Sequence, residues 1–383
     1  MTLSAKKQAQ PMIGQVGGAS IHKKPVLTLA SEYVLKPVLT DHRGIREIAF
    51  YEAMEAVAKA ASISPSYSSF LRYNPQKKGF AILNKLGEIV DTIAMACAML
   101  VQDQVVVSTE TAMRAAWRKV RKEAEALHTI CKFTPSYYGI VGLEAPSLDY
   151  PHGISDETHL LLGDLTANYS KPCVMDLKMG TTTYEPDATT EKKDKEHNKY
   201  PQQGLFGFRI VGMRIYDPGH EEADKDGYRF FGKEYGRGLA ERDQVKEALK
   251  IFFSAGAGKP PKKARNSING RISPVNENAK IRGKSASNVF TQIRLIQKWF
   301  EENKSLLFCA SSLLLVYEGN VSCEAPDITT VRMIDFGRVR RNRPAGDPGY
   351  VHGLSTFKRL VKEILEEEEK RLEELGASSN SRI

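Results

Sequence analysis

The chain has 383 residues, of which 41% are hydrophobic and 26% are charged, and its formal net charge is +9. This much apolar material is enough for a sizeable core, so the composition excludes a wholly disordered chain, and the length predicts two domains. The positive charge favours anionic partners such as nucleic acid, phospholipid or phosphorylated metabolites.

The cysteines and the apolar stretches indicate the kind of compartment. The 5 cysteines are scattered and include no Cys-x-x-Cys pair, which argues against a disulfide framework or a zinc site and favours a reducing compartment. Residues 1–10 lack the apolar segment of a secretory signal. The longest apolar stretch, residues 92–101, is shorter than the roughly 20 residues that span a bilayer, so it predicts a buried helix. We therefore expect an intracellular protein with no membrane span.

The first part of the chain predicts one strand, one clear helix and a long insertion. The β-branched run 31–39 predicts a strand that carries Lys36. Residues 45–60 predict a helix, because their apolar side chains recur near the helical period, and this helix carries Glu47. The residues from about 62 to 130 predict a helical insertion packed on the first lobe.

The rest of the chain predicts short strands interspersed with helices. The runs that predict strands are 159–162, 172–180, 207–216, 311–317 and 330–336, and those that predict helices are 187–199, 242–253, 290–303 and 357–375. Asp187 is the expected N-cap of the first of these helices. The residues from about 254 to 287 are strongly basic and rich in Gly, Pro, Asn and Ser, which predicts a flexible linker.

Two motifs place aspartates at the ends of short apolar strands. Asp335, in Arg332-Met-Ile-Asp335-Phe-Gly-Arg338, lies where a strand becomes a loop, a common position for a carboxylate that holds Mg²⁺ on nucleotide phosphates. Asp176 and Lys178 are two residues apart and therefore share one face of a strand. A carboxylate beside an ammonium group can bind hydroxyls and stabilise a migrating phosphoryl group.

Lys36 and Glu47 supply the ion pair expected of a kinase lobe. Each residue alone has an ordinary explanation, because a lone strand lysine is usually solvated and a strand-end aspartate is usually a cap or turn residue. The order lysine, glutamate, Asp-x-Lys and Asp-Phe-Gly together favours a kinase. A protein kinase is disfavoured, because no His-Arg-Asp loop precedes Asp335, and neither Gly256–Lys259 nor Gly283–Ser285 completes a Walker motif.

The string Pro172-x-x-x-Asp176-x-Lys178-x-Gly180 is the signature of the inositol polyphosphate kinases, and the chain resembles this family. It is similar to the multikinase branch through Tyr184-x-Pro186-x-Ala188, Glu191-Lys192, Lys199-Tyr200-Pro201 and Gly212-Met-Arg-x-Tyr216. Further matches are Gln15-Val-Gly-Gly18, Arg46-Glu47, Pro135-x-Tyr-Tyr-Gly139, Tyr235-Gly-Arg237, Ala310-Ser-Ser-Leu-Leu314 and Gly349-Tyr350. The resemblance covers nearly the whole chain outside the insertion, the linker and the two termini.

The resemblance implies an α+β, two-lobed kinase-like fold with ATP in the cleft between the lobes. The N-lobe would comprise residues 1–163 and include the insertion. The C-lobe would comprise residues 164–383 and include a small helical inositol-binding segment at about 184–201, the basic linker and the C-terminal helix. The cofactors implied are ATP and Mg²⁺.

The resemblance also implies a role for each motif. Lys36 reaches the ATP phosphates and is oriented by Glu47, and the hinge Gly163-Asp164-Leu165 binds adenine through its backbone. Asp176 contacts the ribose or the acceptor hydroxyl, Lys178 contacts the transferred phosphate, and Asp335 holds the metal. Family members commonly have Glu where Gly163 stands, and a more flexible hinge here would weaken ATP binding.

The inositol phosphate needs several cations. Lys192, Lys195 and Lys199 recur at helical spacing and share one face, and Arg43, Lys233 and Arg237 are further candidates. Interleaved acidic residues fit a merely solvated helix equally well, but the resemblance favours Lys192 and Lys199 as substrate ligands. Arg338 stands where the family usually has histidine. Because arginine binds phosphate through two hydrogen bonds, we expect it either on a substrate phosphate or at the surface within the basic run 338–343.

We therefore expect an ATP-dependent inositol polyphosphate multikinase that phosphorylates inositol trisphosphate and tetrakisphosphate. The sister alternatives are an inositol hexakisphosphate kinase and an inositol trisphosphate 3-kinase. A non-catalytic nuclear transcriptional adaptor is the alternative of another class, because the basic run Lys259–Arg265 also suits nuclear import. We expect a monomer in the nucleus and cytoplasm, with nuclear protein partners as an open question.

Overall fold

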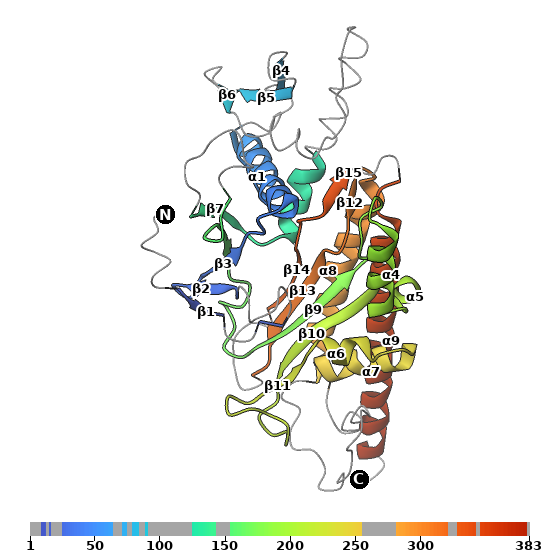
Figure 1. Ribbon diagram of the computed structural model, residues 1–383. Helices are drawn as coiled ribbons and strands as arrows, with labels where there is room; N and C mark the ends of the chain where they lie inside the picture. The colour runs from blue at the N-terminus through green and yellow to red at the C-terminus, as the bar shows by residue number, and fades with distance from the viewer. Residues whose placement is uncertain are drawn as a thin grey trace.

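The computed structural model shows a mixed fold in which helices pack on two five-stranded sheets (Figure 1). The structure describes residues 9–12, 15–16, 25–63, 71–74, 79–83, 89–90, 125–142, 154–254, 281–320, 328–341 and 345–380. Among the helices in these ranges, none has the length and apolar character needed to cross a membrane. The basic run Lys259–Arg265 lies outside the described residues.

The first sheet has the spatial order β1-β2-β3-β8-β7. Its strands are β1 (Gln10–Pro11), β2 (Leu27–Leu29), β3 (Tyr33–Pro37), β7 (Tyr137–Val141) and β8 (His159–Gly163). Helix α1 (His42–Ile63) packs on one face of this sheet, where Tyr51 stacks on Tyr137 at a ring separation of 5.4 Å. Because side chains alternate along a strand, Lys36 of β3 points toward α1, whereas Leu35 joins an apolar cluster on the opposite face.

The second sheet has the order β11-β10-β9-β13-β14, with every neighbouring pair antiparallel. Its strands are β9 (Pro172–Met179), β10 (Phe208–Tyr216), β11 (Tyr228–Phe231), β13 (Ser312–Glu318) and β14 (Thr329–Ile334). The central strand β9 is buried along most of its length, which explains its nearly continuous apolar sequence. A separate two-stranded sheet pairs β12 (Leu306–Phe308) with β15 (Val339–Arg341).

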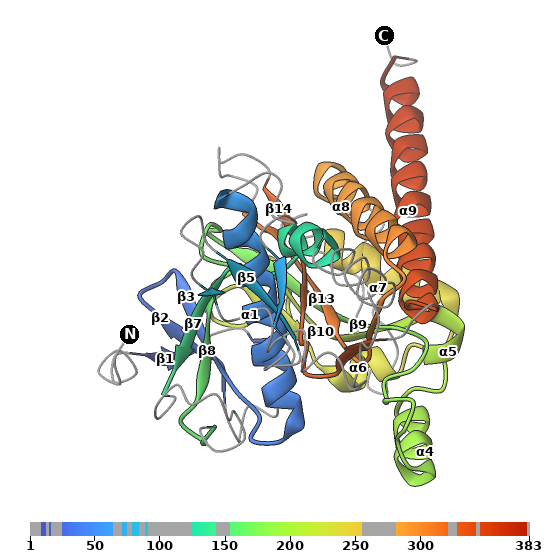
Figure 2. The same ribbon diagram turned by 90° about the horizontal axis from the view of Figure 1, so that it is seen from above.

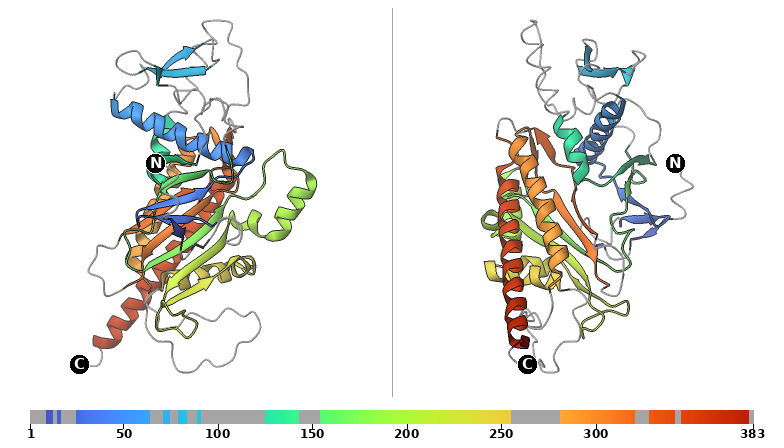
Figure 3. Two further views of the ribbon diagram at one scale, coloured as in Figure 1. Left: turned by 60° about the vertical axis from the view of Figure 1, so that its left-hand side comes forward. Right: turned by 180° about the vertical axis from the view of Figure 1, so that it is seen from behind.

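Three helices cover one face of the second sheet: α7 (Arg242–Phe253), α8 (Gly283–Glu302) and α9 (Pro348–Asn380) (Figures 1 and 3). The buried side chains of α8 recur every three or four residues, which gives the helix one apolar face. Lys246 and Lys250 of α7 contact Glu367 of α9 at 2.5 and 2.6 Å. Exposed pairs of this kind contribute about 0–1 kcal/mol each, so apolar packing is the main force that holds these helices.

The described residues also include the short helices α4 (Thr190–Lys199), α5 (Gln203–Phe206) and α6 (Lys233–Arg237). Figure 2 shows α4 projecting from the body of the molecule on the segment that follows β9. Helix α5 lies against α9, because Gly207 and Gly353 lack side chains at the contact. A Cβ on Gly353 would lie 2.1 Å from the Gly207 carbonyl oxygen, so no larger residue fits there.

Phe336 links α1 to the second sheet. Its fully buried ring lies 4.5 Å from Phe50 and 5.3 Å from Tyr51 of α1, and 6.2 Å from Phe308 of β12. Aromatic pairs at these separations stabilise by roughly 0.5–1.5 kcal/mol each beyond their buried area. The residue that precedes this anchor, Asp335, is therefore held at a fixed place relative to α1.

The expectation of a helical insertion at about 62–130 is wrong for part of that segment. β4 (Leu71–Asn74), β5 (Gly79–Leu83) and β6 (Ile89–Val90) form a three-stranded sheet, although residues 125–130 are helical. The runs in β4 and β5 are too short for a stable helix and are separated by residues that include Pro75, so they pair as strands. The apolar stretch 92–101 lies outside the described residues.

Three helix starts also differ from expectation. Helix α9 begins at Pro348 rather than at 357, because Asp347 accepts a hydrogen bond from the Tyr350 N–H at 2.8 Å and proline favours the first helical position. Helix α8 begins at Gly283, inside the expected linker, because the buried Ala286 joins the core. The N-cap of α4 is Thr189, not Asp187, and its side chain accepts from the Lys192 N–H.

Candidate active site

The strand-borne candidates line the face of the second sheet that is turned away from the covering helices. Leu177 and Met179 belong to the helix-side core, so Asp176 and Lys178, which alternate with them, point to the other face. The expectation that these two side chains share a face is confirmed. Arg209 of β10 and Ser312 of β13 lie directly beside Lys178 in the strand register.

Lys36 contacts two carboxylates. One belongs to Glu47, its expected ion-pair partner, and the other to Asp335, the expected metal ligand. Lys36 Nζ donates to Glu47 Oε1 at 2.6 Å and to Asp335 Oδ1 at 2.5 Å. Burial alone would lower the pKa of Lys36, but the charges of Asp335 and Glu47 outweigh it and raise the pKa. Glu47 Oε1 also accepts from the Phe336 N–H at 3.0 Å, so one carboxylate of α1 holds both the lysine and the backbone beside Asp335.

The loops beneath these side chains adopt left-handed backbone conformations. Asp335 has φ = 65° and Ala310 has φ = 54°, a region that non-glycine residues enter at an energetic cost and that is enriched at functional sites. The Ala310 carbonyl accepts a hydrogen bond from Lys178 Nζ at 2.8 Å. These two backbone positions fix the direction of Lys178 and Asp335.

Asp176 is buried, and its Oδ1 has no hydrogen-bond partner among the described residues. Burial raises its pKa to about 6, with Lys178 opposing the shift and the charge of Asp335 adding to it. Burial likewise lowers the pKa of Lys178, although both aspartates oppose that shift. The pKa of Asp335 is lowered, because Lys36 and Lys178 outweigh the effect of burial.

The two aspartates fit a divalent cation that also binds phosphate. Asp176 offers an unpartnered buried oxygen, and Asp335 is close enough to shift its pKa. Within the described ranges, no three His, Cys, Asp or Glu side chains form a self-contained metal site. Mg²⁺ is usually bound by one or two protein carboxylates and takes its remaining ligands from water and nucleotide phosphates, so this pair of aspartates suits it.

The expected hinge joins β8 to the loop before β9. The N–H groups of Gly163 and Asp164 donate to the carbonyls of Ser136 and Glu32, at 2.9 and 2.8 Å. The Leu165 N–H has no hydrogen-bond partner in the described part of the chain. Of the three hinge N–H groups, that of Leu165 is therefore the one available to a base.

An apolar cluster lies beside this hinge. Leu165, and Leu314 of β13, pack against a buried cluster that includes Val174 of β9 and Val316 of β13. In the register, Val316 is opposite Val174 and Leu314 is opposite Asp176. The cluster therefore continues the face that carries Asp176, as the surface under a nucleotide base must.

The lysines of α4 are paired with an acidic residue of the same helix. Lys192 and Lys199 contact the Glu196 carboxylate at 3.1 and 2.6 Å. Glu196 is buried and also accepts from the Thr183 hydroxyl at 3.2 Å. Lys195 is exposed. The structure thus brings Lys192 and Lys199 together on one carboxylate and leaves Lys195 apart.

The other cationic candidates differ in their surroundings. Arg338 is half-buried, donates to the Thr183 carbonyl at 3.2 Å and is close enough to Lys178 to lower its pKa. Arg43 makes a two-point ion pair with Asp41, and its backbone lies against Gly337. Lys233 begins α6 and is exposed, and it forms no ion pair within the described part of the chain, whereas Arg237 of the same helix pairs with Glu234 at 3.1 Å.

Sequence reasoning missed two charged residues beside this site. Arg209 lies next to Lys178, and Glu185 joins α1 to the segment before α4. The position of Arg209 inside an apolar strand was the available signal, since arginine is seldom buried without a function. The partners of Glu185 lie far away in the sequence, so no local pattern could reveal them.

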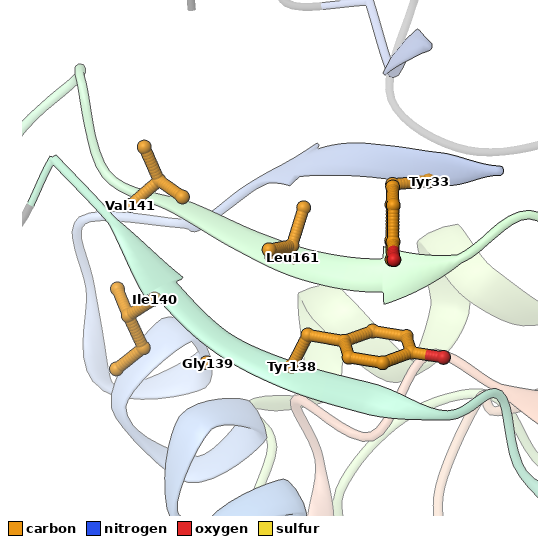
Figure 4. A pocket seen from close by; sticks show the side chains of 6 residues that line it. All are labelled: Tyr33, Tyr138, Gly139, Ile140, Val141 and Leu161. Carbon is orange, nitrogen blue, oxygen red and sulfur yellow. The ribbon is translucent and has the colours of Figure 1, made fainter. Parts of the chain in front are cut away.

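A pocket of about 250 Å³ lies elsewhere, on the first sheet (Figure 4). Its lining includes Tyr33, Tyr138 and Leu161 and contains no charged side chain. Tyr33 and Lys36 are an odd number of residues apart on β3, so the pocket is on the face away from Lys36. The charged cluster at Lys36 and Lys178 is therefore the better candidate for chemistry.

Comparisons with known proteins find similar chains among the inositol phosphate kinases. The rat inositol polyphosphate multikinase is 32% identical over 189 residues, which cover 49% of this chain and 39% of the rat protein. The chain thus spans about two fifths of the length of that relative. Human inositol hexakisphosphate kinase 3 is 23% identical over an alignment that covers 96% of this chain and 97% of the human protein. A solved structure of an inositol phosphate multikinase from S. cerevisiae, in complex with ADP and Mn²⁺, is 22% identical in sequence to this chain. The structural alignment covers 62% of this chain and 90% of the yeast chain, with a TM-score of 0.45.

The sequence profile of the inositol polyphosphate kinases matches residues 159–362. This range contains Asp176, Lys178 and Asp335, and the fold brings Lys36 and Glu47 to them from outside it. The match extends over more than half of the 383 residues, and the chain belongs to the inositol polyphosphate kinase family.

Proposed function

We propose that this protein is an ATP- and Mg²⁺-dependent inositol polyphosphate kinase of the multikinase type, which phosphorylates hydroxyls of inositol trisphosphate and tetrakisphosphate. One observation carries the proposal: Lys36, Glu47 and Asp335 converge on the strand face that presents Asp176 and Lys178. Phosphoryl transfer needs little covalent help from a protein, and positioned charges of this kind supply most of the catalysis.

The nucleotide lies on the side of the hinge and of Lys36. Adenine packs on the cluster around Leu165 and Val316 and accepts a hydrogen bond from the Leu165 N–H. Lys36 exchanges part of its contact with Asp335 for the ATP phosphates, and Glu47 keeps its ammonium group in place. A divalent cation held by Asp335 and Asp176 would neutralise charge on those phosphates.

The acceptor lies on the side of α4. Lys192, Lys199 and Arg338 provide cations for its phosphates, which need several charge-assisted hydrogen bonds. Asp176 contacts the reacting hydroxyl or the ribose. Lys178, which lies between the two sides, stabilises the negative charge of the migrating phosphoryl group.

Asp335→Asn tests the role of the metal ligand. Asparagine also tolerates the left-handed backbone at this position, so the fold should survive. We expect turnover to fall by at least about 100-fold, because the loss of metal-held charge costs several kcal/mol in the transition state. Near-normal turnover of a folded variant, measured with saturating Mg²⁺, would show that Asp335 is not a metal ligand.

The experiment that tests the function is chromatographic. The purified protein is incubated with ATP, Mg²⁺ and, in separate reactions, inositol trisphosphate or inositol hexakisphosphate, and the product isomers are resolved by HPLC. We expect successive conversion to tetrakis- and pentakisphosphate. Phosphorylation of inositol hexakisphosphate alone would identify a hexakisphosphate kinase. A single 3-phosphorylated product from inositol trisphosphate would identify a trisphosphate 3-kinase. No transfer to any inositol phosphate supports the non-catalytic adaptor.

A further inference from the structure

Arg209 is a buried arginine on the strand face that carries Lys178. The two residues are directly opposite each other in the antiparallel pair β9–β10, so their side chains share a face. The neighbours of Arg209 on β10, Phe208 and Ile210, point into the helix-side core. Only 9% of the Arg209 surface is exposed.

The Arg209 guanidinium has no acidic hydrogen-bond partner in the described part of the chain. Its one hydrogen bond runs from Nη1 to the Gln203 side-chain oxygen at 3.2 Å. Gln203 is itself buried and donates to the Gly180 carbonyl at 2.5 Å, so a neutral, fixed amide holds the arginine. Arg229 on the next strand shows the usual alternative, because it is equally buried but contacts Asp217 and Glu222.

The charges around Arg209 do not compensate it. Burial lowers the pKa of Arg209, and the charge of Arg237 adds to this effect, which Glu196, Asp176 and Tyr200 oppose without reversing it. The charge of Arg209 in turn lowers the pKa of Lys178 on the neighbouring strand. An arginine buried without a bonded anion costs free energy, so a fold retains it where an anion binds.

The strand order indicates which anion this is. Along one level of the second sheet lie Arg209 on β10, Lys178 on β9, Ser312 on β13 and Ile334 on β14, which precedes Asp335. Lys36 contacts Asp335 at one end of this row, and Glu196 of α4 influences Arg209 at the other. Arg209 is therefore on the acceptor side of Lys178.

We propose that Arg209 binds a phosphate group of the inositol phosphate acceptor and fixes that phosphate beside Lys178. The inference rests on the proposed function and assigns to it one further specificity-determining residue. Gln203 holds one edge of the guanidinium, so the remaining N–H groups are left to donate two parallel hydrogen bonds to a phosphate monoester. The γ-phosphate of ATP could accept the same hydrogen bonds, and the kinetic test distinguishes it from a phosphate of the acceptor.

The test compares Arg209→Met, Arg209→Lys and the matched control Arg229→Met in the full chain. We expect Arg209→Met to raise KM for inositol trisphosphate by roughly 10- to 100-fold, the value of a charged hydrogen-bonded contact, with KM for ATP unchanged. Its Tm should stay the same or rise, because an apolar side chain replaces an uncompensated buried charge. Arg209→Lys should lie between wild type and Met, because it keeps the charge but not the planar fork.

The control should behave in the opposite way. Arg229→Met leaves the half-buried Asp217 without its ion-pair partner, so Tm should fall while both KM values stay unchanged. An Arg209→Met variant with lowered Tm and unchanged KM would show a merely structural arginine. An equal rise of both KM values would place Arg209 at the nucleotide.

Binding measurements separate this inference from the proposed function. Inositol tetrakisphosphate is titrated calorimetrically into wild type and Arg209→Met without ATP. If the wild type is an active kinase and both proteins bind equally, the assignment of Arg209 fails and the function stands. If the wild type neither binds nor phosphorylates inositol phosphates, the proposed function fails, and the inference fails with it.

Discussion

Glu196 lies between the two lysines that the substrate is proposed to use. Its carboxylate contacts Lys192 and Lys199 and accepts from Thr183, so it orients both ammonium groups and neutralises one of their two charges. Burial alone would raise the pKa of Glu196, but the two lysines lower it to about 2. Glu196 is therefore ionised at neutral pH, and in the proposed function it competes with an incoming phosphate for the same donors.

Glu196→Gln should release the lysines and lower KM for inositol trisphosphate by a few-fold, at a stability cost of about 1 kcal/mol at neutral pH. Because the pKa of Glu196 is lower in the folded state, its stabilising effect is present above about pH 4.5 and is lost as pH falls toward 2. The difference in unfolding free energy between wild type and variant, measured in urea at pH 6 and pH 3, should shrink at the lower pH. A difference that does not depend on pH would contradict the ion-pair assignment.

Local alternation was enough to predict that Asp176 and Lys178 share a face. The ion pair between Lys36 and Glu47 was also predictable, because the kinase-like order of motifs implied it. The place of Arg209 was not predictable, since it depends on how β10 pairs with β9. That register includes an irregularity between Ile210 and Gly212, which no local pattern determines.

Helix α1 and the segment before α4 are joined by a network of charges. Glu185 pairs with Arg46 of α1 and with Arg340 of β15, the latter at 2.6 Å, and Arg340 also contacts Asp187 at 2.9 Å. The side chains of Arg46, Arg340 and Glu185 are less than one fifth exposed, which limits screening by solvent. The helix that carries Glu47 is thereby tied to the segment that carries Lys192 and Lys199, the lysines proposed to bind the substrate.

Glu185→Ala should loosen this connection, because it removes the ion-pair partner of Arg46 and leaves Arg340 with the exposed Asp187. We expect KM for inositol trisphosphate to rise about 10-fold, which corresponds to about 1.4 kcal/mol, while KM for ATP changes little. The matched control is Asp187→Ala, whose side chain is 71% exposed and should have almost no effect. If both variants behave alike in steady-state kinetics, the network does not position α4.

Four strands of the second sheet, β9, β10, β13 and β14, were predictable to within one or two residues, and so was α7, because β-branched runs and helical apolar periods are local signals. The short edge strand β11 was not among the predicted strands. The early starts of α8 and α9 were not predictable from periodicity. Gly349 and Gly353 interrupt the pattern at the start of α9, yet α9 needs Gly353 for its contact with Gly207. Tertiary packing outweighs helix propensity at that point.

At the scale of the whole molecule, two sheets contribute to one set of charges. The first sheet supplies Lys36 and the second supplies Lys178, and the buried ring of Phe336 fixes the approach of α1. In the proposed function, the row from Asp335 across Lys178 to Arg209 separates the nucleotide from the acceptor along one sheet. The sequence indicates which residues take part, whereas the separation follows from strand order, which is non-local.

The most direct test of this separation is titration calorimetry with each ligand in turn. Wild type, Lys36→Met and Arg338→Ala are titrated with Mg·ADP and, separately, with inositol trisphosphate. We expect Lys36→Met to weaken ADP binding by roughly 10-fold or more and to leave inositol trisphosphate binding unchanged, and Arg338→Ala to do the reverse. Equal weakening of both ligands in both variants, or no binding of inositol trisphosphate to the wild type, would contradict the account.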